Sequence, residues 1–495
     1  MFAALLTGLV YAPGLSGDLH LDSGKLYQVE QVYREQGSAV ELKDLSFGRK
    51  FGRVIPQLSF YFNIAASDGV DPFEIKLTNV VIHFINAFMV FLFVATVLQR
   101  TRYCEQSHLL AAAVALLWLI SAVNVSGVLY AVQRMNQLAT LFSLAALVLY
   151  LRVRGASAGR PGSTARWAAL MTGVSLLALL AYACKENALL IPVFILLIEI
   201  FLFPDLPKWL ATKTGKAAAA TVSLALIALL IGVFSGSGLL DYSERTFTLE
   251  ERVLTQARIL WIYISQLLVP TTGAIGLYQD GIPVSTGLFS PASTVAAVAG
   301  LAGLAVFAVM NCRHQTLGII AFGLAFFLAG HGLESSVFPL ELYYEHRNYL
   351  PSTGLYLAFV VSAYWLLQRI PMRYAAGIVV IYLVGIAFVA HGKAVTWSDQ
   401  RLAYSLALER DYLSPRAAGG MAQLYLEEGN VAPAVALLDR VIAESPHEAL
   451  RARLQKLYVQ CATGAPLDEQ LHAQLANVTG RELTIEVSQA ISNVV

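Results

Sequence analysis

The stretch that decides the fold is KLTNVVIHFINAFMVFLFVATVL, residues 76–98. After its first residue this run contains no Asp, Glu, Lys or Arg, and a helix needs about 20 apolar residues to cross the hydrocarbon core of a bilayer. The whole chain shows the same bias, because 57% of its 495 residues are hydrophobic and only 14% are charged. Soluble globular proteins carry about 25% charged residues. The sequence therefore predicts a membrane protein.

Similar apolar segments recur along the chain. Further spans are expected at about 2–16, 108–123, 136–151, 167–183, 188–204, 217–236, 293–311, 316–332, 350–368 and 374–391. The first run has no basic leader and no convincing cleavage site, so we interpret it as a span that stays in place. Residues 253–270 carry Gln256, Arg258 and Gln266 and predict an interfacial or re-entrant helix instead. The expected fold class is all-α, a polytopic membrane protein of about 11 transmembrane helices.

Basic residues gather in alternate connections between these spans. They are Arg100 and Arg102, Arg152 to Arg166, Lys208 to Lys216, Arg313, and Arg369 with Arg373. Short cytoplasmic loops carry an excess of Lys and Arg, so we expect these connections on the cytoplasmic face. The tail after residue 392 then lies on the opposite face.

Net charge and cysteine usage exclude other classes of protein. The net charge is +1, so no surplus of Lys and Arg exists to neutralise phosphates, and no nucleic-acid partner is expected. The four cysteines are scattered without a CxxC pair. Neither a zinc site nor a disulfide framework is indicated.

The chain divides into a membrane domain, residues 1–392, and a soluble helical tail, residues 393–495. Within the tail, MAQLYLEEGNVAPAVALLDRVIAESP matches the pattern of one tetratricopeptide repeat near 417–450, with Gly429 and Asn430 at the turn between its two helices. One repeat cannot bury its apolar face alone. We expect it to pack on helices at 449–462 and 467–477 or on the membrane domain.

The face opposite the basic connections collects the polar clusters. Its first loop, residues 17–75, holds Asp22 just after a span and Arg53 among apolar residues. A carboxylate there is either a solvated loop acid or a general base for a hydroxyl nucleophile. Lys185 and Glu186 lie in a very short turn, and Arg134 begins another span. Charges at span ends either extend to the interface or bind a ligand.

The clearest cluster is GHGLESSVFPLELYYEHRNYLPSTG, residues 330–354, between two apolar spans. Its candidate site residues are Glu334, Glu345, His346, Arg347 and Tyr349. Ionisable groups at membrane depth cost about 2.5–3.5 kcal/mol each on insertion scales, so they mark either function or mutual pairing. Asp280, in GLYQDGIP, is a weaker candidate.

Several motifs resemble those of bacterial membrane glycosyltransferases of the GT-C superfamily. Similar stretches in chain order are LHLDS (19–23), GRVIPQLSF (52–60), VSGVLYAVQRMNQLATLF (125–142), CKENALLIP (184–192) and EHRNYLPS (345–352). The nearest types are pilin-glycosylating transferases and the transmembrane-and-tetratricopeptide O-mannosyltransferases. The resemblance covers nearly the whole chain and implies a GT-C-like membrane domain.

This resemblance implies inverting transfer of a sugar from a polyprenyl-phosphate donor to an acceptor hydroxyl, with Asp22 as the catalytic base. It assigns the donor phosphate to Arg53, Arg134, Lys185 and Arg347. Sugar or acceptor contacts fall to Glu186, Asp280, Glu334, Glu345, His346 and Tyr349. Ser23 stands where the family often has a second acid, so no metal ligands are assigned and a divalent metal is not indicated.

The implied partners are the lipid-linked sugar, membrane lipids and a protein acceptor such as a pilin. The implied location is the bacterial inner membrane, with the site and the tail periplasmic. Two other functions stay open from the residues. A transporter of lipid-linked saccharides is expected to show repeated halves and midplane charges, which we do not find. A scaffold anchoring a protein-binding tail does not need the cluster at 330–354.

Overall fold

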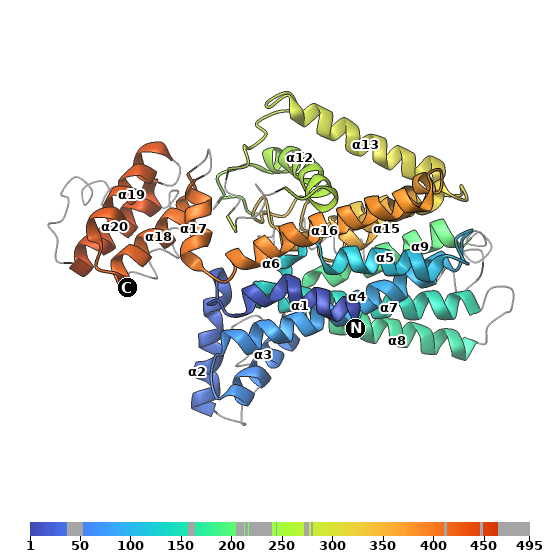
Figure 1. Ribbon diagram of the computed structural model, residues 1–495, viewed down its shortest axis with the longest axis horizontal. Helices are drawn as coiled ribbons and strands as arrows, with labels where there is room; N and C mark the ends of the chain where they lie inside the picture. Colours follow the sequence, from blue (N-terminus) through green and yellow to red (C-terminus); the bar gives the residue numbers. More distant parts are fainter. Residues whose placement is uncertain are drawn as a thin grey trace.

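The computed structural model describes residues 1–36, 53–156, 164–203, 212, 216, 240–243, 245–271, 277–278, 281–409, 413–445 and 449–463. These residues form 18 α-helices and several short 3-10 helices (Figure 1). The predicted all-α class is confirmed for this part of the chain. Helices suit the apolar segments, because an α-helix forms its backbone hydrogen bonds within its own segment.

A bundle of apolar helices forms the body of the molecule. Its members are α1 (Phe2–Leu15), α4 (Pro72–Leu98), α5 (Ser107–Leu119), α7 (Arg134–Ala156), α8 (Thr164–Tyr182), α9 (Ile191–Leu202), α13 (Ser293–Asn311), α14 (Leu317–Gly330), α15 (Ser352–Leu367) and α16 (Met372–Thr396). Each matches one predicted span. The remaining predicted span, residues 217–236, lies outside the described residues.

Four helices of the described chain are long and apolar enough to cross a membrane. They are Pro72–Leu98, Ala131–Gly155, Ser293–Asn311 and Met372–Thr396. Five shorter apolar helices accompany them. These lengths indicate a multi-pass membrane protein, whereas a count of 11 spans stays a prediction.

The bundle has two chemically different ends, seen at the left and right of Figure 1. We call the left one the loop end, because residues 331–351 connect α14 to α15 there. At the other end, Arg102 donates to Thr316 Oγ1 (2.9 Å) and Arg313 donates to the Phe203 carbonyl (3.1 Å). These contacts bring the connections after α4, α9 and α13 together. We call this the basic end, and it agrees with the expected clustering of basic connections.

Further elements lie at or begin near the loop end. They are η1 (Leu21–Lys25), α2 (Leu26–Gln36), α3 (Val54–Ser67), α6 (Asn124–Leu129), η4 (Ala131–Gln133), η5 (Glu186–Leu190), α12 (Leu249–Leu268) and η7 (Glu345–Asn348). The segment expected to be interfacial or re-entrant is α12, which starts with a Thr248–Glu251 capping box. Its start lies near the loop end, since Arg252 in its first turn donates to the Ser336 carbonyl (2.9 Å).

The tail forms α17 (Gln400–Leu408), α18 (Pro415–Glu427), α19 (Val431–Glu444) and α20 (Ala449–Thr463). The turn between α18 and α19 contains Gly429 at φ +77°, a backbone conformation that favours glycine. Ala422, Leu438 and Val459 bury their side chains in one small core. The predicted repeat turn and its partner helix at 449–462 are confirmed, while the helix predicted at 467–477 lies outside the described residues.

Small residues allow α14 and α15 to pack closely. A Cβ atom added at Gly354 would lie 2.4 Å from the Gly323 carbonyl oxygen, and one added at Gly323 would meet Gly354 equally closely. Close approach of backbones at small residues is a common way for membrane helices to associate. This contact also fixes where α15 begins and therefore where residues 331–351 end.

We expect Gly354→Val to destabilise the protein by about 1–3 kcal/mol or more, because the added side chain overpacks a contact between two backbones. Gly377→Val is the matched control, since Gly377 lies on α16 with nothing within 4 Å of an added Cβ atom. Thermal unfolding of both variants in detergent measures the difference. Equal melting temperatures would contradict the close packing of α14 on α15.

Candidate functional site

The acid of the first loop lies exposed at the loop end. The Tyr130 hydroxyl donates to Asp22 Oδ2 (3.1 Å) and accepts from the Asp22 backbone N–H (3.2 Å). Leu21, the preceding residue, has φ +55°. A non-glycine residue in the left-handed region costs conformational energy and often accompanies functional sites. The carboxylate is thus held in one orientation while its outer side faces solvent.

Buried polar contacts anchor the chain before Asp22 to two helices. Lys76 Nζ donates to the Gly14 carbonyl (3.0 Å) at the end of α1 and also reaches the Gly17 carbonyl. His20 Nε2 lies 2.9 Å from the Trp397 carbonyl oxygen. Burial lowers the pKa of His20 to about 4, so this ring is neutral at pH 7. The first loop is therefore fixed to both α4 and the end of α16.

A second group of charges is buried between η5 and the segment at 331–351. Lys185 Nζ lies 2.8 Å from Glu334 Oε1, and Asn187 donates to the other carboxylate oxygen (3.0 Å). Burial alone would raise the pKa of Glu334, but the charges of Lys185 and Arg347 outweigh it and hold that pKa well below its usual range. Glu334 is therefore ionised at neutral pH.

His346 is linked to both of these groups. Its ring stacks on Tyr344, with centroids 4.9 Å apart, and lies 6.3 Å from the Tyr130 ring. Burial lowers the pKa of His346 well below its usual range, and the charge of Lys185 lowers it further. His346 thus lies near the Tyr130 side chain that holds Asp22 and within the electrostatic influence of the Lys185–Glu334 pair.

Arg53 is the predicted phosphate-binding residue with the most open surroundings. It precedes α3 with φ +69°, and its Nη2 lies 3.7 Å from Glu186 Oε2, the two side chains being 33% and 44% exposed. Within the described residues its shielded Nε–H has no hydrogen-bond partner. An Arg in this state retains donors for an oxyanion.

The guanidinium groups of two other predicted phosphate-binding residues already donate hydrogen bonds to protein oxygens. Arg134 is fully buried and donates to Asn79 Oδ1 (2.7 Å) and Asn63 Oδ1 (2.6 Å). Arg347 donates to the carbonyls of Leu342 (2.9 Å) and Glu341 (2.6 Å) within its own segment. These contacts give both guanidinium groups a structural role.

Besides Glu334 and His346, two further predicted substrate contacts are buried. Tyr349 is fully enclosed by the helix bundle, with its hydroxyl 2.7 Å from His83 Nδ1. Glu345 forms a buried ion pair with Lys393 of α16. Asp280 lies outside the described residues. Of the predicted substrate contacts that the structure describes, Glu186 is the one that is not buried, and it lies beside Arg53.

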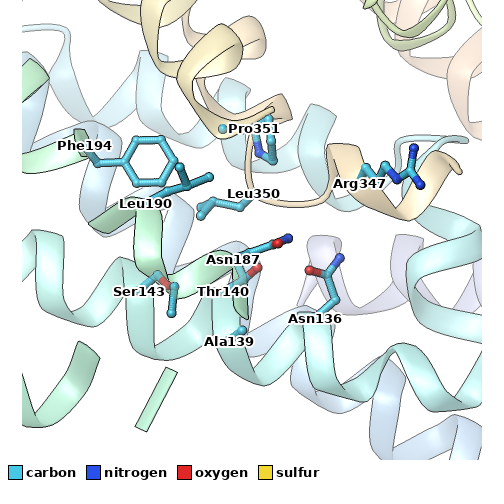
Figure 2. Close-up of a pocket in the computed structure, with 12 residues that line it drawn as sticks. Asn136, Ala139, Thr140, Ser143, Asn187, Leu190, Phe194, Arg347, Leu350 and Pro351 are labelled. Atoms are coloured by element: carbon cyan, nitrogen blue, oxygen red, sulfur yellow. The ribbon is translucent and has the colours of Figure 1, made fainter. Parts of the chain in front are cut away.

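A small pocket lies behind these residues, between α7, η5 and the start of α15 (Figure 2). Asn136 and Asn187 reach into it from two elements, and Arg347 lines its wall. The cavity volume is about 20 Å³, room for roughly one water molecule. The pocket is therefore too small for an organic ligand.

Helix α12 supports the segment at 331–351, a role that the sequence did not indicate. Arg252 donates to the Glu334 carbonyl (2.9 Å), Gln256 to the Leu342 carbonyl (2.7 Å) and Tyr263 to the Tyr344 carbonyl (2.9 Å). The signal that could have revealed it is the four-residue spacing of Arg252 and Gln256, which places both on one helix face.

The tail also reaches the site. Arg416, near the start of α18, donates to the Tyr344 hydroxyl (3.4 Å), and Tyr344 stacks on His346. The tail is therefore linked to the loop end through a specific polar contact.

Among the described residues, no group of three or more His, Cys, Asp and Glu side chains is arranged to hold a metal ion. Comparison of the chain with protein-family models, with curated proteins and with solved structures finds no match.

Proposed function

We propose that this chain is an integral membrane glycosyltransferase of the GT-C type. It would transfer a sugar from a polyprenyl-phosphate donor to a hydroxyl, with a Ser or Thr of an exported protein such as a pilin as the acceptor. The observation that carries the proposal is the placement of exposed Asp22 and accessible Arg53 on the same polar end of an apolar helix bundle. A lipid-linked substrate needs such a meeting of polar groups and hydrocarbon.

The proposed step is a single displacement. The Asp22 carboxylate accepts the proton of the acceptor hydroxyl, and the acceptor oxygen attacks the anomeric carbon. The bond from that carbon to the phosphate oxygen breaks, and the polyprenyl phosphate leaves with the bonding electron pair. One displacement inverts the anomeric configuration.

Arg53 is the group proposed to stabilise the leaving phosphate, because its guanidinium is accessible and retains donors. Lys185 and Glu334 form a buried ion pair whose charges act on His346. Glu186, beside Arg53, is the proposed contact to the sugar hydroxyls, and buried His346 supports the loop end through its stacking on Tyr344. In this proposal the protein lies in a bacterial inner membrane with the loop end in the periplasm.

The proposal is tested by reconstituting the purified full-length chain in liposomes. Short-chain polyprenyl-phosphate monosaccharides and a Ser/Thr-containing peptide are supplied, and glycopeptide is detected by mass spectrometry. We expect transfer from the lipid-phosphate donor and none from a nucleotide sugar. Movement of labelled donor across the bilayer without any glycopeptide would indicate a transporter instead.

Arg53→Gln is expected to lower kcat/KM for the donor about ten- to hundredfold, since hydrogen bonds to charged groups contribute about 1.5–3 kcal/mol. Stability should change little, because the Arg53–Glu186 pair is partly exposed. Arg34→Gln is the control, as it removes another exposed arginine of the loop end, one that pairs with Glu30 (2.6 Å). A similar loss in both variants would show that the general charge of the loop end, and not a contact of Arg53 to phosphate, is what matters.

A further inference from the structure

A second polar pocket lies at the basic end, where α4, α5 and α7 meet. Its volume is about 210 Å³. Arg100, His108 and Arg152 line it together with Thr96 and Gln99. Pockets for drug-sized ligands measure about 300–1,000 Å³, so this one suits a smaller group. The lining contains cations and neutral polar groups but no Asp or Glu, which favours an anion.

The cations of this pocket retain unused donors. Exposed Arg152 has no hydrogen bond or ion pair with any residue that the structure describes. Arg100 donates to the carbonyls of Thr96 (2.7 Å) and Leu151 (2.6 Å), which leaves further N–H groups of its five available. On the same helix as Arg152, by contrast, Arg154 is buried in an ion pair with Glu199 (2.9 Å). Glu199 therefore neutralises Arg154, whereas the guanidinium of Arg152 stays exposed.

Apolar surface leads directly to the pocket. Phe88 of α4 and Leu109 of α5 are 58% and 66% exposed. The Phe88 ring stacks on Phe91, with centroids 6.3 Å apart, and Phe91 stacks on His108 at 6.0 Å. Phe91 also lines the pocket. An apolar stripe that ends at a basic pocket matches the shape of a lipid, whose acyl chains adjoin a charged headgroup.

We propose that this pocket binds the phosphate of an anionic membrane lipid, with Arg100, Arg152 and His108 holding the headgroup and the Phe88–Phe91 surface contacting an acyl chain. The ligand chemistry is a phosphate ester, which a soluble molecule also offers. The adjoining exposed aromatic surface favours the lipid. This site lies at the end opposite Asp22 and does not depend on the proposed transfer reaction.

The experiment is native mass spectrometry of the full-length protein in detergent with phosphatidylglycerol added. Arg152→Gln removes an exposed cation of the pocket and His108→Gln its exposed imidazole, whereas Arg373→Gln removes an exposed arginine that the pocket does not include. We expect each pocket variant to weaken phosphatidylglycerol binding about fivefold and Arg373→Gln to leave it within twofold of wild type. Melting temperatures show that each variant is folded. If one of the two pocket variants does not fold, the other still tests the proposal.

Three results would overturn the proposal. The first is unchanged phosphatidylglycerol binding in the folded pocket variants. The second is an equal loss in Arg373→Gln, which would reflect the general charge of the basic end. The third is displacement of the lipid by soluble glycerol 3-phosphate at equal concentration, which would assign the pocket to a free phosphate ester.

Discussion

Asp22→Asn is expected to lower the rate of sugar transfer about 100- to 10,000-fold, the contribution of a positioned general base. An amide cannot take the proton of the acceptor hydroxyl. The protein should stay folded, because the amide oxygen can still accept the Tyr130 hydrogen bond and the side chain is exposed. Initial rates of glycopeptide formation measure the loss, and thermal unfolding reports on the fold.

The matched control is Asp18→Asn, which removes one negative charge from an exposed position of the same loop. It should transfer sugar within about threefold of wild type, since long-range effects of exposed charges are screened by salt. If Asp22→Asn kept the normal rate while folded, the centre of the proposed mechanism would be lost. If both variants lost activity equally, the charge of the loop would matter rather than one base.

The positions of the helices follow from local sequence, because apolar runs alone dictate where a chain can be buried in lipid. The boundaries required other signals. Helix α4 starts at Pro72, four residues before the predicted run, since Asp71 caps it and Pro72 occupies its first turn. Helix α12 likewise starts after the Thr248 cap. Both signals are local and could have been used.

The state of each candidate side chain could not be predicted, because its neighbours come from distant parts of the chain. Arg134 looks like an accessible cation at the start of a span, yet Asn63 and Asn79 enclose it. Tyr349 looks like part of a polar cluster, yet its hydroxyl forms a hydrogen bond with His83 inside the bundle. Arg53 differs from these residues because tertiary packing leaves its side chain partly exposed.

The partners of the candidate residues were also hidden from the sequence. Tyr130 orients Asp22 from the connection between α6 and η4, and Arg416 reaches Tyr344 from the tail. Neither residue belongs to a pattern with a local signature. Their roles depend on the loop end gathering the ends of several helices, which a one-dimensional pattern does not specify.

Lys185→Met is expected to lower the free energy of unfolding by about 3–5 kcal/mol, because it leaves the buried carboxyl group of Glu334 without its ion-pair partner. The low pKa of Glu334 depends on the charge of Lys185, so its loss destabilises the folded state at neutral pH. Thermal unfolding at pH 7 should show a clear drop in the melting temperature. Transfer activity should fall with the fraction of folded protein.

The double variant Lys185→Met/Glu334→Gln then separates a structural role from a phosphate-binding role. Removing both charges leaves no unpaired ion, so most of the lost stability should return. Because Lys185 is enclosed whereas Arg53 stays accessible, we expect transfer to recover to within about tenfold of wild type, a loss of no more than about 1.4 kcal/mol. A stable double variant that still lost transfer a hundredfold or more would instead place the Lys185 charge on the donor phosphate, as the resemblance implied.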